Sequence, residues 1–377
     1  MERLNVGLIG SGFMGRSHAL ALRMAPATFP LALSPNLEIL ADITTDQANQ
    51  AAARFGFRRS TDDWLELVTD PLVDLVDITA PNHLHEAMAL AAIEAGKIVY
   101  CEKPLAPNAE VSRRLTEAAE ARGTKTQVGF NYLKNPVVKL AKDMIDGGEL
   151  GEITGFRGIH AEDYMSDPDQ PWSWRLDPKG GGGVTADLGS HIISMARFLL
   201  GSIQSVSAKT RTVHASRPVS SGSTERRPVE VEDEAKALLT FSSGVLGSLE
   251  ASWVATGRTM FLAFEVYGTK GALAFNQERL NELSFYPAGQ PAGRSGPVTI
   301  VAGPEHAHYA GFCPAPGHQL GFNDLKTIEV REMVDALATG QNPWPDFREA
   351  YEVQKVVDAI LASSRERAWV DLGWYAP

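Results

Sequence analysis

The residues Leu4–Ile9 (LNVGLI) and the next six, Gly10–Gly15 (GSGFMG), decide the fold that we expect for this chain. The first run is apolar enough for a buried strand, and the second matches the pattern G-x-G-x-x-G, with a helix expected over Phe13–Met24. This order of strand, turn and helix binds a pyrophosphate, since glycines let the backbone approach and the helix N-terminus supplies N–H donors. The residues expected to contact a dinucleotide are Gly10, Gly12, Phe13, Met14 and Gly15.

Asp42 decides which dinucleotide we expect. It ends the second apolar run, Leu37–Ile43, and lies 27 residues after Gly15. The usual spacing is about 20 residues, and we assign the excess to an inserted loop over Pro26–Asn36. A carboxylate here binds the adenine ribose hydroxyls and repels a 2′-phosphate, and no arginine follows in the next three residues. We therefore expect NAD, with NADP less favoured; a glycine turn that binds no nucleotide is the alternative.

Strands and helices alternate through the first 130 residues. Further strands are expected at Val73–Thr79, Ile98–Cys101 and Thr126–Phe130, and further helices at Thr44–Phe55, Asp62–Val68, His83–Ala95 and Ala109–Arg122. This alternation is typical of a parallel sheet with helices on both faces. The sequence predicts an α/β, Rossmann-type dinucleotide-binding domain over residues 1–130.

After residue 130 strands follow one another with few helices between them. The expected strands are Ile153–His160, Val206–Val213, Glu234–Phe241, Val245–Trp253, Met260–Tyr267 and Ala272–Asn276. A helix is expected to begin at Pro136, and two more cover Asn323–Ala338 and Arg348–Arg367; Ser216–Glu230 and Pro287–Gly296 are expected to be loops, the first of them mobile. Short turns between strands predict a large, open, mostly antiparallel sheet. The fold class is therefore α/β plus α+β, with a substrate domain over residues 131–377.

Length, charge and cysteine content exclude several classes of protein. The chain has 377 residues, enough for two to three domains at about 150 residues each. Its 35 Lys and Arg against 46 Asp and Glu give a net charge of −11, which argues against nucleic acid and membranes as partners. Two cysteines make no disulfide framework, and neither a membrane span nor a signal peptide is seen. We expect a soluble, cytoplasmic protein.

Two loops follow strands of the first domain at the sheet edge where ligands bind in open parallel sheets. The loop after the third strand contains Pro81, Asn82 and His85, and the loop after the fourth contains Glu102 and Lys103. We expect both loops to contact the cofactor, and Lys103 to reach a substrate oxygen next to it. The alternatives are a helix cap at Asn82, solvent-exposed histidines and an ordinary surface lysine.

A run of four glycines, Gly180–Gly183, leads into a helix that carries Asp187 and His191. A buried stripe at helical spacing is predicted for Leu188, Ile192, Met195 and Leu199. Asp187 and His191 are four residues apart and share another face, where a carboxylate can hold and tune an imidazole for proton transfer. The alternative is a capping aspartate and a core histidine.

Taken in order, these motifs resemble the glucose-fructose oxidoreductase, inositol dehydrogenase and rhizopine-catabolism family, called Gfo/Idh/MocA. The resemblance covers nearly the whole chain, and its most specific elements are Glu102-Lys103-Pro104 and the pair Asp187 and His191. Other matching stretches are Gly10–Gly15, Asp42, Thr79–His85, Gly148–Ile153 and Gly181–His191. The resemblance implies two domains and subunit contacts through the open sheet, so we expect a homodimer or homotetramer.

The resemblance also implies roles for individual residues. Lys103 is expected to bind substrate and relay protons, and Asp187 and His191 to be substrate and acid/base residues. Ser194 is a departure, because many relatives carry Asp three residues after the histidine. No metal is expected, and we interpret three further histidines as solvated loop residues: His306, His308 and His318.

Within the family, three stretches are most similar to dehydrogenases of levoglucosan and of inositols: Gly129–Tyr132, Tyr164–Arg175 and the segment from Gly321 to Glu329. Aromatic and polar side chains in the second stretch suit a sugar, whose ring faces stack and whose hydroxyls need partners. A packing loop is the alternative. The expected substrate-binding residues are Lys103, Asn131, Tyr164, Trp174, Arg175, Asp187 and His191.

We therefore expect NAD-dependent oxidation of a secondary hydroxyl on a neutral cyclic polyol or sugar. The resemblance implies a substrate ring between the nicotinamide and the sheet of the second domain. His191 would take the hydroxyl proton, and Lys103 would stabilise the developing negative charge. Two rivals share the fold: a glycosidase that uses NAD transiently, and a silent sugar sensor, which the presence of Lys103, Asp187 and His191 disfavours.

Overall fold

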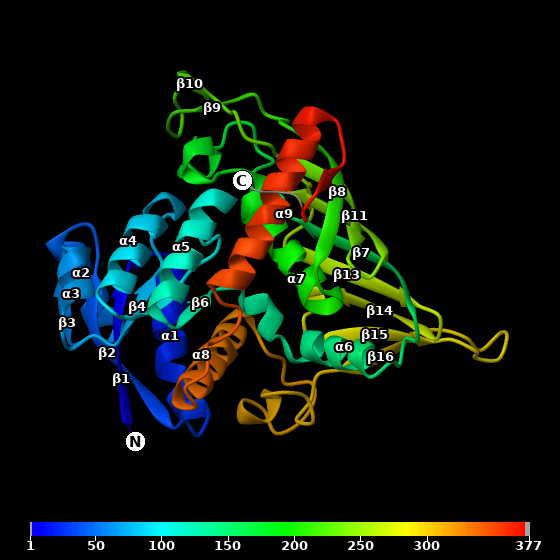
Figure 1. Cartoon of the computed structure of the whole chain (residues 1–377), viewed down its shortest axis with the longest axis horizontal. Helices are drawn as coiled ribbons and strands as arrows, with labels where there is room; N and C mark the ends of the chain where they lie inside the picture. Colours follow the sequence, from blue (N-terminus) through cyan, green and yellow to red (C-terminus); the bar gives the residue numbers. More distant parts are fainter. Residues whose placement is uncertain (1, 374–377) are drawn as a thin grey trace. The chain divides into compact units, whose positions relative to one another are not determined.

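The structure is a computed structural model that describes residues 2–373, and the chain divides into two compact units. Unit 1 consists of Met1–Lys134 and Gly321–Glu352, and unit 2 of Asn135–Leu320 and Val353–Pro377 (Figure 1). The sequence predicts one boundary at residue 130, whereas the chain changes unit after residues 134, 320 and 352. Unit 1 therefore includes a late segment that the sequence assigns to the second domain.

Unit 1 contains a six-stranded sheet with the order β3-β2-β1-β4-β5-β6, in which all pairs are parallel. Its strands are β1 (Glu2–Ile9), β2 (Leu33–Ala41), β3 (Arg59–Thr61), β4 (Leu75–Ile78), β5 (Ile98–Cys101) and β6 (Thr126–Val128). Every residue of β4 is buried, as expected for a parallel strand covered on both faces. The Rossmann-type architecture is confirmed.

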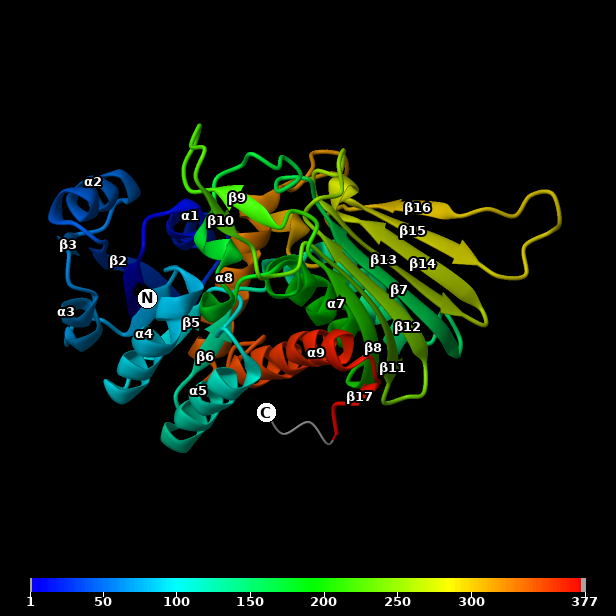
Figure 2. The ribbon, with the colours of Figure 1, turned by 90° about the horizontal axis from the view of Figure 1, so that it is seen from above.

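Helices cover both faces of this sheet. They are α1 (Phe13–Thr28), α2 (Thr45–Phe55), α3 (Trp64–Thr69), α4 (Asn82–Glu94), α5 (Ala109–Arg122), α8 (Phe322–Ala338) and the first turns of α9 (Phe347–Glu366). α1 packs against α8 on one face, and α4 packs against α3 and α5 on the other (Figure 2). Helix ends follow local chemistry: the Asn108 side chain accepts the Val111 N–H at the start of α5, and Gly123 ends it with a φ of +64°.

The prediction of an inserted loop over Pro26–Asn36 is wrong. α1 continues through Pro26 to residue 28, and β2 already begins at residue 33. Pro35 fits within β2 because β3 pairs only with Ile39–Ala41, which leaves β2 unpaired on that side at residue 35. The extra residues before Asp42 therefore lengthen a helix and a strand.

Unit 2 contains a nine-stranded sheet with the order β16-β15-β14-β13-β7-β12-β11-β8-β17. Its strands are β7 (Ile153–Ala161), β8 (Ile203–Arg211), β11 (Glu234–Phe241), β12 (Leu246–Ser252), β13 (Phe261–Gly268), β14 (Gly271–Asn276), β15 (Glu282–Pro287), β16 (Val298–Val301) and β17 (Val370–Asp371). All neighbours pair antiparallel except β7 and β12. The expected open, mostly antiparallel sheet is confirmed, and β15, β16 and β17 are additional strands.

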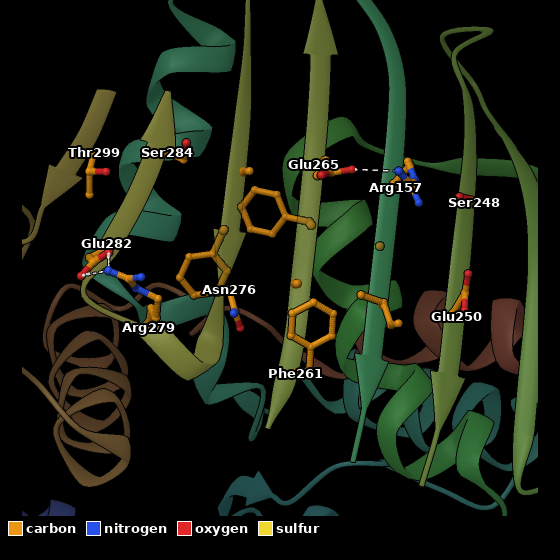
Figure 3. Close-up of a pocket in the computed structure, with 16 residues that line it drawn as sticks. Arg157, Ser248, Glu250, Phe261, Glu265, Asn276, Arg279, Glu282, Ser284 and Thr299 are labelled. Carbon is orange, nitrogen blue, oxygen red and sulfur yellow. Dashed lines mark hydrogen bonds and ion pairs between the residues drawn. The ribbon is translucent and has the colours of Figure 1, made fainter. Parts of the chain in front are cut away.

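Helices lie against one face of the unit 2 sheet. α6 (Pro136–Asp146) packs against β15, and α7 (Ser190–Leu200) packs against β7, β12 and β13 (Figure 2). The opposite face, which we call the outer face, holds a hollow of about 500 Å³. Arg157 and Glu265, paired on the neighbouring strands β7 and β13, form an ion pair in the lining of this hollow, and Phe261 lines it farther along β13 (Figure 3). Within residues 2–373, α6 and α7 thus cover one face of the unit 2 sheet and leave the outer face open.

The segment Ser216–Glu230 contains a hairpin where the sequence predicts a mobile loop. Its strands β9 (Ser216–Pro218) and β10 (Arg226–Pro228) pair antiparallel. Arg217 is fully buried, and its guanidinium donates to the carbonyl oxygens of Met165, at 2.6 Å, and Asp167. These bonds anchor the hairpin within unit 2, a contact that composition rich in Ser, Arg and Pro does not reveal.

Candidate functional site

The glycine turn Gly10–Gly15 joins β1 to α1. Gly10 has a φ of +96°, and a Cβ on Gly15 would lie 2.1 Å from the Gly10 carbonyl oxygen, so both positions require glycine. A Cβ on Gly12, the N-cap of α1, would meet nothing within 4 Å. Free space at a helix N-terminus suits a phosphate, and the turn therefore fits the pyrophosphate of a dinucleotide.

Asp42 follows β2 and contacts this turn. Its Oδ2 accepts the Ser11 N–H at 3.0 Å and the Ser11 hydroxyl, and its Oδ1 accepts the Ile43 N–H at 2.7 Å. Ile43 is 81% exposed, so the carboxylate stands at the surface of unit 1. This position suits contact with ribose hydroxyls and opposes a 2′-phosphate.

The loop after β4 is tied to the loop after β5 by His85. Pro81 is the N-cap of α4 and Asn82 its first residue. The ring of His85 is buried, with Nε2 2.8 Å from the Ala80 carbonyl oxygen and Nδ1 2.9 Å from the Pro104 carbonyl oxygen. Burial lowers the pKa of His85 although both carbonyls oppose this. The His85 side chain thus joins the two loops, and the cofactor contact that the sequence predicts for it stays a prediction.

The Glu102 side chain points into the interior of unit 1. Its Oε1 accepts hydrogen bonds from His18 Nε2 and Lys326 Nζ, both at 2.8 Å, and its Oε2 accepts the Lys103 N–H at 3.2 Å. Although burial opposes it, Lys326 and His18 hold the pKa of Glu102 well below its usual range. We call the connected buried residues the Glu102 cluster: His18, Asp77, Tyr100, Glu102, Lys326 and Glu329. Lys103, the next residue, is half-buried.

Stability should depend on pH through His18. Burial lowers the pKa of His18, but Asp77 and Glu102 outweigh both burial and Lys326 and raise it above its usual 6.5. The unfolded chain releases this proton at lower pH than the folded one, so the stabilisation is complete below 6.5 and is lost as the pH rises through the raised pKa. We expect the melting temperature, measured by scanning fluorimetry, to fall over this range more steeply in the natural protein than in His18→Asn. Parallel curves would contradict this.

Asn131 begins a 3₁₀ turn, Asn131–Lys134, and is only 3% exposed. Among residues 2–373 its Nδ2 finds no hydrogen-bond partner. The adjacent Tyr132 ring lies 6.2 Å from that of Phe322, which lies 5.6 Å from that of the exposed Phe13. A buried amide that lacks a protein partner, next to aromatic rings, suits a ligand that carries hydroxyls.

Asp187 lies in a π-helical turn, Thr185–Gly189, that leads into α7. Its Oδ2 accepts the Tyr164 hydroxyl at 2.7 Å and Arg175 Nε at 3.3 Å. Burial, with the charge of Asp187, raises the pKa of Tyr164, so its hydroxyl stays a donor. Unit 2 thus brings three of the expected substrate residues into contact.

His191 is buried in the first turn of α7. Its ring lies 5.5 Å from that of His160, whose Nδ1 is 2.9 Å from the Leu188 carbonyl oxygen and whose Nε2 is 3.0 Å from Glu162 Oε1. The predicted apolar stripe is buried throughout: Leu188, Ile192, Met195 and Leu199. The contacts of His160 and Glu162 near His191 were not predicted from the sequence. The sequence at the end of a strand does not indicate which helix its side chains will meet.

The tryptophans of the Tyr164–Arg175 stretch pack against arginines. The Arg175 guanidinium lies 4.5 Å from the centroid of Trp174, and that of Arg227 lies 3.5 Å from the centroid of Trp172. Packing is therefore part of the role of this stretch. In the part of the chain that the structure describes, however, the buried Trp172 Nε1 has no hydrogen-bond partner, which leaves a donor for a polar ligand.

Three further expectations concern Ser194, metals and membranes. The Ser194 hydroxyl donates to the His191 carbonyl oxygen at 2.8 Å, so it supports α7. No three His, Cys, Asp or Glu residues gather as a metal site within residues 2–373, and His306 Nδ1 accepts the N–H of Gly303 in its own loop at 2.9 Å. Over the same range, none of the helices has the length and apolar character needed to cross a membrane.

Two family models match the chain. Residues 4–130 match an oxidoreductase family with an NAD-binding Rossmann fold, and residues 138–274 match the GFO/IDH/MocA C-terminal domain. A levoglucosan dehydrogenase from Pseudarthrobacter phenanthrenivorans is 39% identical over 385 aligned residues, which cover 99% of this chain and 99% of the relative. The chain belongs to the Gfo/Idh/MocA family. It is an NAD-binding oxidoreductase.

Other members of the Gfo/Idh/MocA family extend this likeness. The scyllo-inositol 2-dehydrogenase (NAD(+)) of Bacillus subtilis is 28% identical over 91% of this chain and 88% of its own. A solved levoglucosan dehydrogenase in complex with NADH and levoglucosan matches with a TM-score of 0.95 and 40% identity, over 98% of this chain and 100% of that chain. The fold of both units is therefore that of a Gfo/Idh/MocA oxidoreductase.

Proposed function

We propose that this Gfo/Idh/MocA protein oxidises a secondary hydroxyl of a neutral cyclic polyol or sugar, such as levoglucosan or an inositol, with NAD. The observation that carries the proposal is the convergence of Tyr164 and Arg175 on one oxygen of Asp187. This arrangement fixes a carboxylate, a group that accepts hydrogen bonds from sugar hydroxyls. The names of the relatives, dehydrogenases of levoglucosan and scyllo-inositol, support the same class of substrate.

Each residue has a defined task in this proposal. When bound, the nicotinamide accepts a hydride from the carbon that carries the hydroxyl. His191 takes the proton of that hydroxyl, and Lys103 donates a hydrogen bond to its oxygen and stabilises the developing negative charge. Asp187, held by Tyr164 and Arg175, orients a neighbouring hydroxyl. The glycine turn and the carboxylate after β2 hold the cofactor.

The charges around Asp187 favour an uncharged substrate. Arg175 is the one basic residue in the Tyr164–Arg175 stretch, and its Nε is already bonded to Asp187. A phosphorylated sugar is normally bound by several cationic donors. The net charge of −11 adds no general attraction for an anion.

A substrate panel followed by NADH absorbance tests the proposal. We expect levoglucosan or an inositol isomer to be oxidised well. Epimers should have a kcat/KM lower by about tenfold or more, because a misplaced hydroxyl leaves a buried polar group such as the Asn131 amide without a hydrogen bond. Sugar phosphates and acyclic 2-hydroxy acids serve as controls. If these controls outperform every neutral cyclic polyol, the proposed substrate class is wrong.

The same panel separates the two rival functions. A glycosidase of this fold would cleave a glycoside without net formation of NADH, because its NAD is reduced and reoxidised in one cycle. A sugar sensor would bind a ligand and give neither product. Chromophore release from an aryl glycoside, measured beside NADH absorbance, therefore distinguishes all three.

We also propose that the chain forms a homo-oligomer, a dimer or tetramer, through the outer face of the unit 2 sheet. Within residues 2–373, α6 and α7 lie against the other face. Large apolar residues exposed on the outer face include Leu238, Leu246, Tyr267, Tyr286 and Val301. Apolar groups gathered on an open face mark interaction surfaces. Light scattering measures the mass in solution, and a monomer at micromolar concentration would contradict the proposal.

We likewise propose a cytoplasmic location, which fractionation of the host cell would test.

A further inference from the structure

The Glu102 cluster gathers three carboxylates, one lysine and one histidine inside unit 1. Lys326 is fully buried, with its Nζ 2.8 Å from Glu102 and 2.6 Å from Glu329. Tyr100 donates its hydroxyl to Glu329, and Asp77 is fully buried beside His18. Removing such groups from water costs free energy that their mutual attraction often fails to recover. The cluster is therefore expected to have a role besides stabilising the fold.

His18 carries a second positive charge in the cluster. Its Nδ1 lies 2.8 Å from Asp77 Oδ1, and its Nε2 lies 2.8 Å from Glu102 Oε1. Although burial lowers the pKa of His18, the two carboxylates raise it above its usual value, which favours an imidazolium with a donor on each ring nitrogen. Glu102 thus receives charge-assisted hydrogen bonds from two cations, His18 and Lys326, and such bonds are stronger than neutral ones.

The bonds to Glu102 continue to the backbone of Lys103. While Oε1 of Glu102 binds the two cations, its Oε2 accepts the Lys103 N–H at 3.2 Å. On another side the carboxylate lies against Gly129, where an added Cβ would be 2.3 Å from Oε1. Glu102 is therefore held on several sides, and its position limits that of the next residue in the chain.

We propose that His18 and Lys326 are positioning residues, which hold Glu102 and through it fix the backbone from which the Lys103 amine extends. This inference rests on the proposed function, in which Lys103 binds the reacting oxygen. Neither residue is assigned a contact with substrate. Lys326 acts from α8, 224 residues after Glu102 in the sequence.

Lys326→Met tests the inference, with Lys134→Met as the matched control. Both lysine side chains are buried in unit 1, 0% and 4% exposed, and each lies 2.6 Å from a glutamate of α8. Lys326 also bonds Glu102, whereas Lys134 bonds Glu332 and the Trp344 carbonyl oxygen.

In Lys326→Met we expect kcat for the preferred polyol to fall about ten- to a hundredfold, because a small displacement of a reacting group has effects of this size. KM for NAD and the affinity for NADH should change by less than about threefold, since the loss lies in the chemical step. The primary isotope effect with substrate deuterated at the oxidised carbon should rise for the same reason. Lys134→Met should keep kcat within about twofold.

Other outcomes overturn the inference or the function separately. If kcat falls in both Lys326→Met and Lys134→Met in proportion to the decrease in their melting temperatures, the cluster has only a structural role. If Lys326→Met does not fold, the double variant Lys326→Met, Glu329→Gln removes one charge of each sign and carries the same expected loss of kcat. An active natural protein with an unchanged kcat in the folded variant overturns the positioning role alone. A natural protein that oxidises no polyol overturns the proposed function.

Discussion

Alanine at Lys103 or at His191 is expected to lower kcat by about 10²- to 10⁴-fold, which is the usual effect of removing a group that assists proton transfer or stabilises charge. His191 is buried in the first turn of α7, close to His160, so water is a poor substitute for its imidazole. Lys103 extends from the backbone that Glu102 holds, and no other lysine follows β5 directly. Steady-state rates with the best polyol of the panel measure the effect.

The His191→Ala variant also separates catalysis from cofactor binding. His191 belongs to unit 2, whereas the glycine turn belongs to unit 1. The dissociation constant for NADH, followed by its fluorescence, should therefore change by less than about threefold. His306→Ala is a suitable control, because that histidine is bonded within its own loop. Near-normal turnover in either alanine variant would refute the assigned role.

The choice of cofactor is expected to depend on Asp42. Repulsion between its carboxylate and a 2′-phosphate at the surface of unit 1 should cost about 1–3 kcal/mol, so kcat/KM with NAD should exceed that with NADP about ten- to a hundredfold. Asp42→Ser removes the negative charge and keeps a small polar side chain. We expect most of the preference for NAD to disappear in this variant, chiefly through better use of NADP.

Asp46→Asn is the matched control for this test. Asp46 is an exposed carboxylate in the first turn of α2, four residues after Asp42, so it carries the same charge without contacting the glycine turn. Its loss should change the preference by less than about twofold, because exposed charges at a distance are screened. Equal efficiency with both cofactors in the natural protein would contradict the role given to Asp42.

Elements with strong local signals were predictable from the sequence. The bounds expected for β5, β11 and α5 agree with those in the structure. In α5, Asn108 supplies a side-chain cap and Gly123 a left-handed end, so the residues at both ends specify the helix directly. The glycine turn was equally clear, because its G-x-G-x-x-G spacing and the strand and helix that flank it all lie within residues 4–24.

Prediction failed where tertiary contacts override local preference. The prolines at positions 26 and 35 suggest a loop, but one lies in the last turn of α1 and the other in β2 where β3 does not reach. β16 contains only four residues and is specified by its pairing with β15. Arg217 belongs to a stretch whose composition is typical of a loop, yet its bonds to carbonyl oxygens about 50 residues earlier hold a hairpin.

The candidate site was also predictable only in part. The motifs around Lys103, Asp187 and His191 are short and recognisable in the sequence. The partners of these residues are not, because Lys326 reaches Glu102 across 224 residues and Tyr164 reaches Asp187 across 23. Titratable side chains in separate elements give no sequence signal of their pairing, and only the packed chain shows which of them meet.

α8 belongs to unit 1 although it follows most of unit 2 in the sequence, so the two parts of unit 1 are encoded in separate parts of the gene. A fragment that ends at residue 130 would keep Tyr100 and Glu102 but lack Lys326, the cation that both of them contact. The nucleotide-binding half is therefore not a module that can be cut from the gene as one continuous piece. A recombination event that exchanges the first third of the chain between relatives would separate Glu102 from its lysine, unless α8 were exchanged with it. We therefore expect that an exchange of the first segment keeps the cluster intact only when α8 is exchanged with it.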